Sequence, residues 1–220
     1  MTSTPNNLII RDLGLQDYQP IWLAMQNFTA NRNESTPDEL WCLEHPATFT
    51  MGLNGKDKHL LNIKDIPVIN IDRGGQVTYH GPGQLIIYTL IDLARLNIGV
   101  KELVNSIEQS IMTLLKQYEI EALGKEGAPG VYVDEKKIAA LGLRIKRNKS
   151  YHGLSLNIDM DLSPFQQINP CGYDNLEVTQ IKDLQPIPDG SKIKSDLITL
   201  LGEKLGYRKQ DILFSSESII

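Results

Sequence analysis

Leu85-Ile86-Ile87-Tyr88-Thr89-Leu90-Ile91 is a run of seven residues whose odd and even positions are both predominantly apolar. In a strand, successive side chains point to opposite faces, so a strand with one wet face alternates between apolar and polar residues. A run that is apolar on both sides is typical of a central strand covered on both faces. The sequence therefore predicts a sheet built around this run, with other elements packed on each side of it.

The rest of the chain contains more predicted strands than helices. Apolar residues at three- and four-residue spacing indicate the helices. Predicted helices cover residues 18–28, 104–118 and 193–205. Further predicted strands cover residues 8–10, 40–44, 66–71, 131–133, 138–145 and 151–158. Because the strands cluster in hairpins, we expect an α+β fold with a mixed or antiparallel sheet flanked by helices.

Length and composition fit a single domain over residues 1–220, with a disordered tail at 1–7 and a second tail at 215–220. Hydrophobic residues make up 41 % and charged residues 22 %, as in ordinary globular proteins. No window is apolar enough to span a membrane, and the polar start lacks the features of a signal peptide. The net charge of −5 argues against nucleic-acid binding. We therefore expect no membrane or nucleic-acid partner.

The two cysteines lie in different surroundings. Cys42 is in the apolar run Leu40-Trp41-Cys42-Leu43, where a thiol behaves as a small hydrophobe. Cys171 is in Asn169-Pro170-Cys171-Gly172, a turn that cannot continue a helix or a central strand. These contexts favour free thiols in a reducing cytoplasm over a disulfide. We interpret Cys42 as core, whereas Cys171 is either an inert structural residue or a presented, reactive thiol.

Strand alternation also makes a prediction about Lys137. Odd positions from Ala139 to Ile145 are apolar, whereas the even positions include Arg144 and Lys146. If the alternation extends back unbroken, Lys137 points to the apolar side, where burial disfavours its charged form. If the preceding turn breaks the register, the lysine instead reaches out to water.

His152 shares its alternation with Leu154, Leu156 and Ile158, so we expect its ring to face inward. An inward histidine is more often a hydrogen-bonded core residue than a ligand. The four histidines have no metal-ligand spacing and the cysteines are not paired, so no metal site is predicted.

Residues 73–84 (RGGQVTYHGPGQ), which precede the central run, are rich in glycine. Glycine lets a backbone pass close to a ligand, although a hairpin with tight turns uses the same residues. Residues 52–57 (GLNGKD) lack the spacing of a phosphate-binding loop and the Ser or Thr after its lysine. Nor does a Gly-x-Gly-x-x-Gly motif open a helix. We therefore expect no ATP or dinucleotide cofactor.

Four motifs occur in order along the chain: RGGQVTYHGPGQ at 73–84, KIAALG at 137–142, HGL at 152–154 and NPCG at 169–172. Together they closely resemble the lipoyl/octanoyl transferases of lipoate biosynthesis. The resemblance implies a biotin/lipoate protein ligase-type catalytic fold. It also implies an acyltransferase that moves an octanoyl group from octanoyl-acyl-carrier protein, through a cysteine thioester, to the ε-amine of a lysine on lipoyl domains.

By the same resemblance, the thioester-forming cysteine falls on Cys171 and its partner lysine on Lys137. The implied substrate-binding residues are Arg73, Gly74, Gly75, Gln76, Val77, Thr78, Tyr79, His80, Ala140, Leu141, Gly142, His152, Gly153, Leu154 and Ser155. The implied donor is acyl-carrier protein. The implied acceptors are the lipoyl domains of 2-oxoacid dehydrogenases and the glycine cleavage H protein. Neither ATP nor a metal is implied, and we expect a monomer.

The chemistry requires an ionised sulfur. A thiol with a pKa near 8.5 is about 3 % thiolate at pH 7, and lowering that pKa by two units raises the fraction to about three quarters. Lys137 would achieve this as a cation, or would accept the thiol proton if burial left it neutral. Backbone amides around Leu141 and Gly142 are candidates to stabilise the oxyanion.

Three other functions remain open at this point. An ATP-dependent lipoate or biotin ligase would share the fold, a carrier-binding module would bind without catalysis, and a thioesterase would give the acyl group to water. Because acyl-carrier proteins are acidic, a basic run is a candidate docking patch, with a solvated hairpin tip as the alternative. This run consists of Arg144, Lys146, Arg147 and Lys149.

Overall fold

The computed structural model describes residues 7–174, 176–186, 189–217 and 219. Its strands are β1 (Leu8–Leu15), β2 (Asp38–Glu44), β3 (Thr48–Met51), β4 (Val68–Asn70), β5 (Val77–His80), β6 (Gln84–Leu90), β7 (Leu123–Gly124), β8 (Gly130–Val133), β9 (Lys136–Lys146), β10 (Lys149–Asn157) and β11 (Ile212–Ser215). Its α-helices are α1 (Tyr18–Asn31), α2 (Leu93–Leu96), α3 (Val100–Gln117) and α4 (Gly190–Lys204). Short 3₁₀ turns are η1 (Asp57–His59), η2 (Ser163–Gln167), η3 (Pro170–Gly172), η4 (Ile181–Asp183) and η5 (Lys209–Asp211). The tails predicted at 1–7 and 215–220 include residues 1–6, 218 and 220, which lie outside the described residues.

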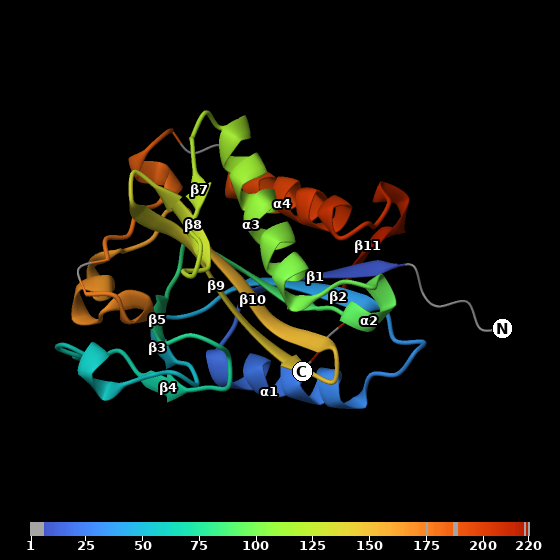
Figure 1. The fold of residues 1–220 in the computed structure, drawn as a ribbon, viewed down its shortest axis with the longest axis horizontal. Helices are drawn as coiled ribbons and strands as arrows, with labels where there is room; N and C mark the ends of the chain where they lie inside the picture. The colour runs from blue at the N-terminus through green and yellow to red at the C-terminus, as the bar shows by residue number, and fades with distance from the viewer. Residues whose placement is uncertain (1–6, 175, 187–188, 218, 220) are drawn as a thin grey trace.

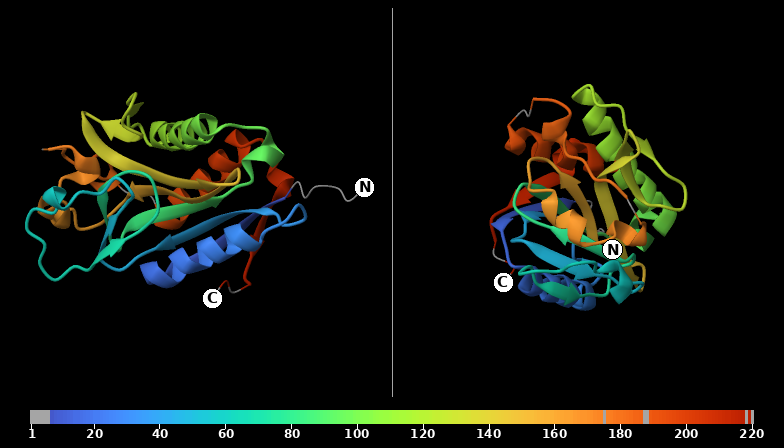
Figure 2. Two further views of the ribbon diagram at one scale, coloured as in Figure 1. Left: turned by 60° about the horizontal axis from the view of Figure 1, so that its bottom comes forward. Right: turned by 90° about the vertical axis from the view of Figure 1, so that its left-hand side faces the viewer.

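The main element is an eight-stranded mixed sheet with the strand order β11-β1-β2-β6-β10-β9-β8-β7 (Figure 1). β6, the predicted central strand, pairs with β2 on one side and with β10 on the other. Helix α1 covers one face of the sheet, and α3 and α4 cover the other (Figure 2). Ile87 of β6 belongs to the core on the α3 and α4 face, whereas Ile86 belongs to the core under α1. The predicted α+β class, with a mixed sheet flanked by helices, is confirmed.

Helix α3 shows why these residues form a covering layer. Its buried residues Leu103, Ile107, Ile111 and Leu114 recur at three- and four-residue spacing, which places them on one side of the helix. Burying an apolar side chain of this size stabilises the fold by about 1.5–3 kcal/mol. The apolar stripe therefore holds α3 against the sheet.

A smaller sheet with the order β4-β3-β5 positions the glycine-rich segment. β5 pairs with β3, with Tyr79 opposite Phe49. Both rings belong to a third core cluster that includes Phe165 and Ile168. Because Ile168 lies three residues before Cys171, this cluster fixes the cysteine turn beside β5.

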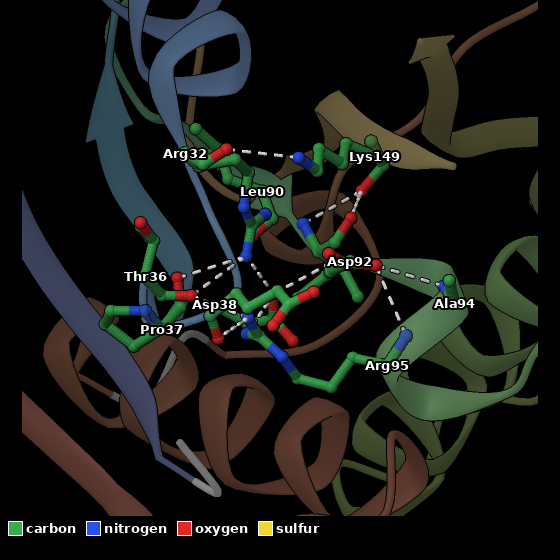
Figure 3. Close-up of polar contacts among 12 residues, drawn as sticks. Arg32, Thr36, Pro37, Asp38, Leu90, Asp92, Ala94, Arg95 and Lys149 are labelled. Carbon is green, nitrogen blue, oxygen red and sulfur yellow. Dashed lines mark hydrogen bonds and ion pairs between the residues drawn. The ribbon is translucent and has the colours of Figure 1, made fainter. Parts of the chain in front are cut away.

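A buried ion cluster around Asp38 ties α1, β2 and α2 together (Figure 3). The fully buried Asp38 carboxylate pairs with Arg32 and with Arg95, whose Nη1 lies 3.2 Å from Oδ1. It also accepts hydrogen bonds from the Tyr207 hydroxyl and from the Asp92 backbone N–H. Removing one partner of a buried ion pair leaves a charge that is costly to bury alone.

We expect Asp38→Asn to lower the free energy of unfolding by about 3–5 kcal/mol, because two guanidinium groups lose their carboxylate. The matched control is Asp12→Asn, which removes the carboxylate of a solvent-accessible pair with Lys194 and should cost less than about 1 kcal/mol. Urea denaturation measures both changes. Similar losses in the two variants would contradict a stabilising role for the buried cluster.

Candidate active site

Cys171 is presented by a strained turn, η3. Its backbone has φ 56°, in the left-handed region that a non-glycine residue seldom adopts. Two backbone hydrogen bonds hold the turn, from the Asn169 N–H to the His59 carbonyl and from the Gly172 N–H to the Asn169 carbonyl, both at 2.9 Å. Cys171 is partly exposed, whereas Cys42 is fully buried, as expected for a core residue.

Lys137 lies against this thiol. Its Nζ is 3.1 Å from the Cys171 Sγ and 3.3 Å from the Pro129 carbonyl oxygen, and it lies 5.0 Å from the centre of the Tyr132 ring. The side chain is buried, with 4 % of the residue exposed. The structure therefore brings together two residues that are 34 positions apart in the sequence.

The predicted burial of Lys137 is confirmed, but the face predicted from alternation is wrong. Ala139 pairs with Val131 while Lys137 pairs with Tyr132, so β9 contains one extra residue at this point. Such a bulge interrupts the alternation of side chains. Ala139 and Val131 face the core under α3, whereas Lys137 shares the opposite face with the Tyr132 ring.

Charge at this pair favours the ammonium form of the lysine. Burial alone would lower the pKa of Lys137, but the adjacent Cys171 sulfur and the Tyr132 side chain outweigh burial and raise that pKa above its ordinary value. Lys137 is therefore a cation at neutral pH when it faces an ionised sulfur. Of the two forms that the sequence left open, the structure favours the cation.

A small cavity lies between β5, β6, β9 and β10, and Cys171 is part of its lining. It is lined by Tyr18, Arg73, Gly75, Gln76, Val77, Thr78, His80, Ile86, Tyr88, Ala140, Leu141, Gly142, His152, Gly153, Leu154, Ser155 and Cys171. The lining contains every predicted substrate-binding residue except Gly74 and Tyr79. Gly74 instead donates its backbone N–H to the Leu143 carbonyl, and the Tyr79 ring packs against Phe165.

Sequence reasoning missed three lining residues: Tyr18 of α1, and Ile86 and Tyr88 of β6. Tyr18 carried only the signal of a helical stripe. Ile86 and Tyr88 carried only the signal of a doubly covered strand. No pattern in the sequence separates a residue that faces a cavity from one that faces a packed core.

His152 is buried, as predicted, but its ring lies on the other side of the sheet from Leu154. The ring stacks on Tyr151 at 5.1 Å and contacts Tyr88, both of which belong to the core under α1, whereas Leu154 belongs to the core under α3. His152 has φ 59°, and this left-handed backbone breaks the alternation of β10.

Asp72, which sequence reasoning also missed, orients the His152 ring. Its carboxylate lies 3.2 Å from the His152 Nε2 and accepts hydrogen bonds from Trp22, Gln26 and the Tyr151 hydroxyl. Burial opposes ionisation of this carboxyl, but the hydrogen bonds outweigh burial and hold the pKa of Asp72 well below its usual range. The carboxylate thus fixes one wall of the cavity.

The other histidines near the cavity are neutral. Burial lowers the pKa of His80 to about 3 and that of His45 to about 4. The His45 Nδ1 donates to the Gln16 carbonyl and its Nε2 accepts from the Tyr88 hydroxyl at 2.7 Å. Among the described residues, no group of three His, Cys, Asp or Glu side chains is placed to hold a metal ion. No helix in the described ranges is long and apolar enough to cross a membrane.

The proposed docking run lies on the hairpin of β9 and β10. Lys149 donates from Nζ to the Arg32 carbonyl at 3.1 Å, so its amine is held against the fold. Arg147 is at the hairpin tip, ten residues along the strand from Lys137, or about 30 Å at 3.3 Å per residue. Docking of the carrier at this run stays a prediction, and the distance favours the alternative of a solvated hairpin tip.

Comparison with known proteins decides the family. The model of the lipoyl protein ligase A/B catalytic domain matches residues 17–199. The chain belongs to this family. It is 58 % identical over 200 residues to an octanoyltransferase of Shewanella amazonensis, a match that covers 91 % of this chain and 93 % of the relative. The family predicted from the four motifs is therefore confirmed.

Solved structures of low sequence identity support the same fold. A chain from the bi-partite lipoate protein ligase and E2 lipoyl domain system of Thermoplasma acidophilum matches with a TM-score of 0.74 and 15 % identity, covering 97 % of this chain and 88 % of its own. Biotin protein ligase from Aquifex aeolicus, in complex with biotin and ATP, matches with a TM-score of 0.56 and 14 % identity, covering 90 % and 70 %. The predicted biotin/lipoate protein ligase-type fold is confirmed.

Proposed function

We propose that this protein is an octanoyltransferase that takes an octanoyl group from octanoyl-acyl-carrier protein onto Cys171 and passes it to a lysine of a lipoyl domain. The observation that carries the proposal is the 3.1 Å separation between the Lys137 Nζ and the Cys171 Sγ, beside a cavity whose lining includes Cys171. The octanoyltransferase relative, 58 % identical over most of both chains, supports the same acyl group.

In the first half of the reaction, the Cys171 thiolate attacks the carbonyl carbon of the donor thioester. The new S–C bond forms, the bond to the carrier's sulfur breaks, and that sulfur leaves with the Lys137 proton. Exchange of one thioester for another is nearly balanced in free energy, so the step needs no ATP. Thiolate nucleophiles paired with a neighbouring cation or base are the usual arrangement for such covalent catalysis.

Acylation changes the charge around Lys137. The sulfur charge that raises the lysine's pKa is consumed in the thioester, whereas burial, which lowers that pKa, remains. Lys137, left neutral by the first step, is then suited to accept a proton from the incoming lysine ammonium. The freed amine attacks the thioester, Cys171 leaves as a thiolate, and the second amine proton passes to water.

Apolar side chains in the cavity lining support the role of an acyl site. Burying six or seven methylenes at about 0.8 kcal/mol each contributes roughly 5 kcal/mol of binding free energy. Apolar walls are provided by Val77, Ile86, Leu141 and Leu154. The proposed acceptors are the lipoyl domains of 2-oxoacid dehydrogenases and the glycine cleavage H protein, and the proposed location is the cytoplasm. We propose no ATP and no metal as cofactors.

The deciding experiment mixes the protein with octanoyl-carrier and a lipoyl domain, without ATP, and follows both proteins by intact mass. We expect one octanoyl group on the lipoyl-domain lysine. Transfer only from free octanoate plus ATP would instead identify a ligase. Released octanoate without modified acceptor would identify a thioesterase, and no acyl transfer from the carrier would leave a binding module.

A further inference from the structure

The side-chain amide of Gln76 packs directly on the residue that follows the nucleophile. A Cβ built on Gly172 would lie 2.0 Å from the Gln76 Nε2 and 2.5 Å from its Oε1, much closer than any real contact. Gly172 also has φ 78°, which glycine tolerates best. The missing side chain at position 172 thus makes room for the Gln76 amide beside Cys171. Gln76 and Cys171 line the same cavity.

The fold does not anchor the oxygen of the Gln76 amide, because the Oε1 is buried and has no hydrogen-bond partner among the described residues. The donor end of the amide, Nε2, is the atom that lies nearest to the space left by Gly172. Gln84, a buried glutamine near the cavity, differs: its Nε2 donates to Asn157 at 2.9 Å and its Oε1 lies 2.8 Å from the His80 Nδ1. Leaving a buried amide oxygen unpaired costs about 1–3 kcal/mol. Such a group in a native protein calls for a functional explanation.

The other candidate donors near the cavity lie in a paired strand or donate to carbonyl groups of the fold. The candidate backbone amides of Leu141 and Gly142 belong to β9, where these residues pair with Leu154 and Gly153 of β10. The Arg73 guanidinium donates to the carbonyl oxygens of Thr50 and Gly74. The Gln76 amide touches Gly172, the residue next to Cys171 in the turn that carries the sulfur.

We propose that Gln76 is a further catalytic residue, whose amide N–H donates to the carbonyl oxygen of the acyl thioester as that oxygen becomes an oxyanion. The inference rests on the proposed acyl transfer through Cys171. Attack by sulfur converts the C=O bond to C–O⁻ while the S–C bond forms, and collapse restores the carbonyl as the carrier's sulfur leaves with the Lys137 proton. A donor held near the developing charge stabilises the transition state more than the ground state.

The test measures the rate at which Cys171 gains an octanoyl group from octanoyl-carrier in single-turnover mixing. Gln76→Glu keeps the length and shape of the side chain but replaces the amide donor with a carboxylate. We expect an acylation rate about 100-fold lower, as when one oxyanion donor is removed elsewhere, with an unchanged concentration dependence on carrier. Lowering the pH should restore part of the rate relative to wild type, because a protonated carboxyl donates again.

The matched control is Gln166→Glu, which makes the same change at an exposed side chain on η2 and should stay within about twofold of the wild-type rate. Gln76→Met, which retains bulk against Gly172, should be as slow as Gln76→Glu without recovering at low pH. A wild-type rate in Gln76→Glu would overturn the role of Gln76. A different result would contradict the proposed acyl transfer itself: no octanoyl group gained by the wild-type protein.

Discussion

Replacing Cys171 by serine should abolish the octanoyl adduct on the protein and lower transfer to a lipoyl domain by about 10⁴-fold or more, as expected when a covalent nucleophile is removed. Serine keeps the shape of the side chain, so η3 and the cavity should stay intact. Its hydroxyl, however, does not ionise near neutral pH, and a lysine ammonium at 3.1 Å cannot make it a nucleophile comparable with a thiolate. Intact mass after mixing with octanoyl-carrier measures the adduct, and a discontinuous assay measures the modified acceptor.

The chain supplies its own control in Cys42. This thiol is fully buried in the core under α3, and burial raises its pKa to about 12. Cys42→Ala should therefore gain one octanoyl group at the wild-type rate. An adduct that persists in Cys171→Ser, or that disappears in Cys42→Ala, would show that Cys171 is not the nucleophile.

The layers of the fold could be predicted because they depend on apolar patterns that are local in the sequence. β6 is buried on both faces as its run of apolar residues indicates, and α3 covers the sheet with the stripe that its spacing predicts. The pairing of β1 with β11 was not predicted, since it joins Leu8 to Ile212 and no local pattern encodes a contact over that separation.

The site was harder to predict because it depends on departures from regular strands. A bulge in β9 places Lys137 on the face that alternation assigns to solvent, and left-handed backbone at His152 turns its ring away from Leu154. These irregularities move side chains from one face of a sheet to the other, which a period of two cannot express. The motifs of the family pointed to residues that the structure places around one cavity, whereas the argument from alternation assigned Lys137 and His152 to the wrong face of the sheet.

Asp72 and Tyr18 were missed for a different reason. Asp72 is one residue before the glycine-rich motif, and its role comes from Trp22, Tyr151 and His152, which approach it from three other segments. Tyr18 reaches the cavity from α1, a helix that contains none of the four motifs. A carboxylate whose hydrogen-bond donors come from distant segments cannot be recognised from the residues next to it in the sequence.

Replacing Lys137 by methionine should slow acylation of Cys171 by about 10²–10⁴-fold, the range typical of a lost acid–base partner. Methionine fills a similar volume without a charge, so the buried site next to Tyr132 should keep its packing. Two effects add in this variant, because the thiolate loses its neighbouring cation and the departing sulfur loses its proton donor. Mixing with octanoyl-carrier and following the adduct by mass over time measures the rate.

The pH dependence separates this role from simple packing. Lys137 has a raised pKa in the folded protein, so it stays an ammonium across the neutral range and loses its proton only as the pH rises through that raised value. Without the ammonium, the thiolate loses its neighbouring cation, so acylation by Lys137→Met should increase more steeply with pH across the neutral range than acylation by the wild type. Lys136→Met is the matched control, since the neighbouring lysine is exposed and pairs with Glu177 at the surface. Its rate should stay within about twofold of wild type, and a Lys137→Met variant that matched it at every pH would show that the amine beside the sulfur has no part in the chemistry.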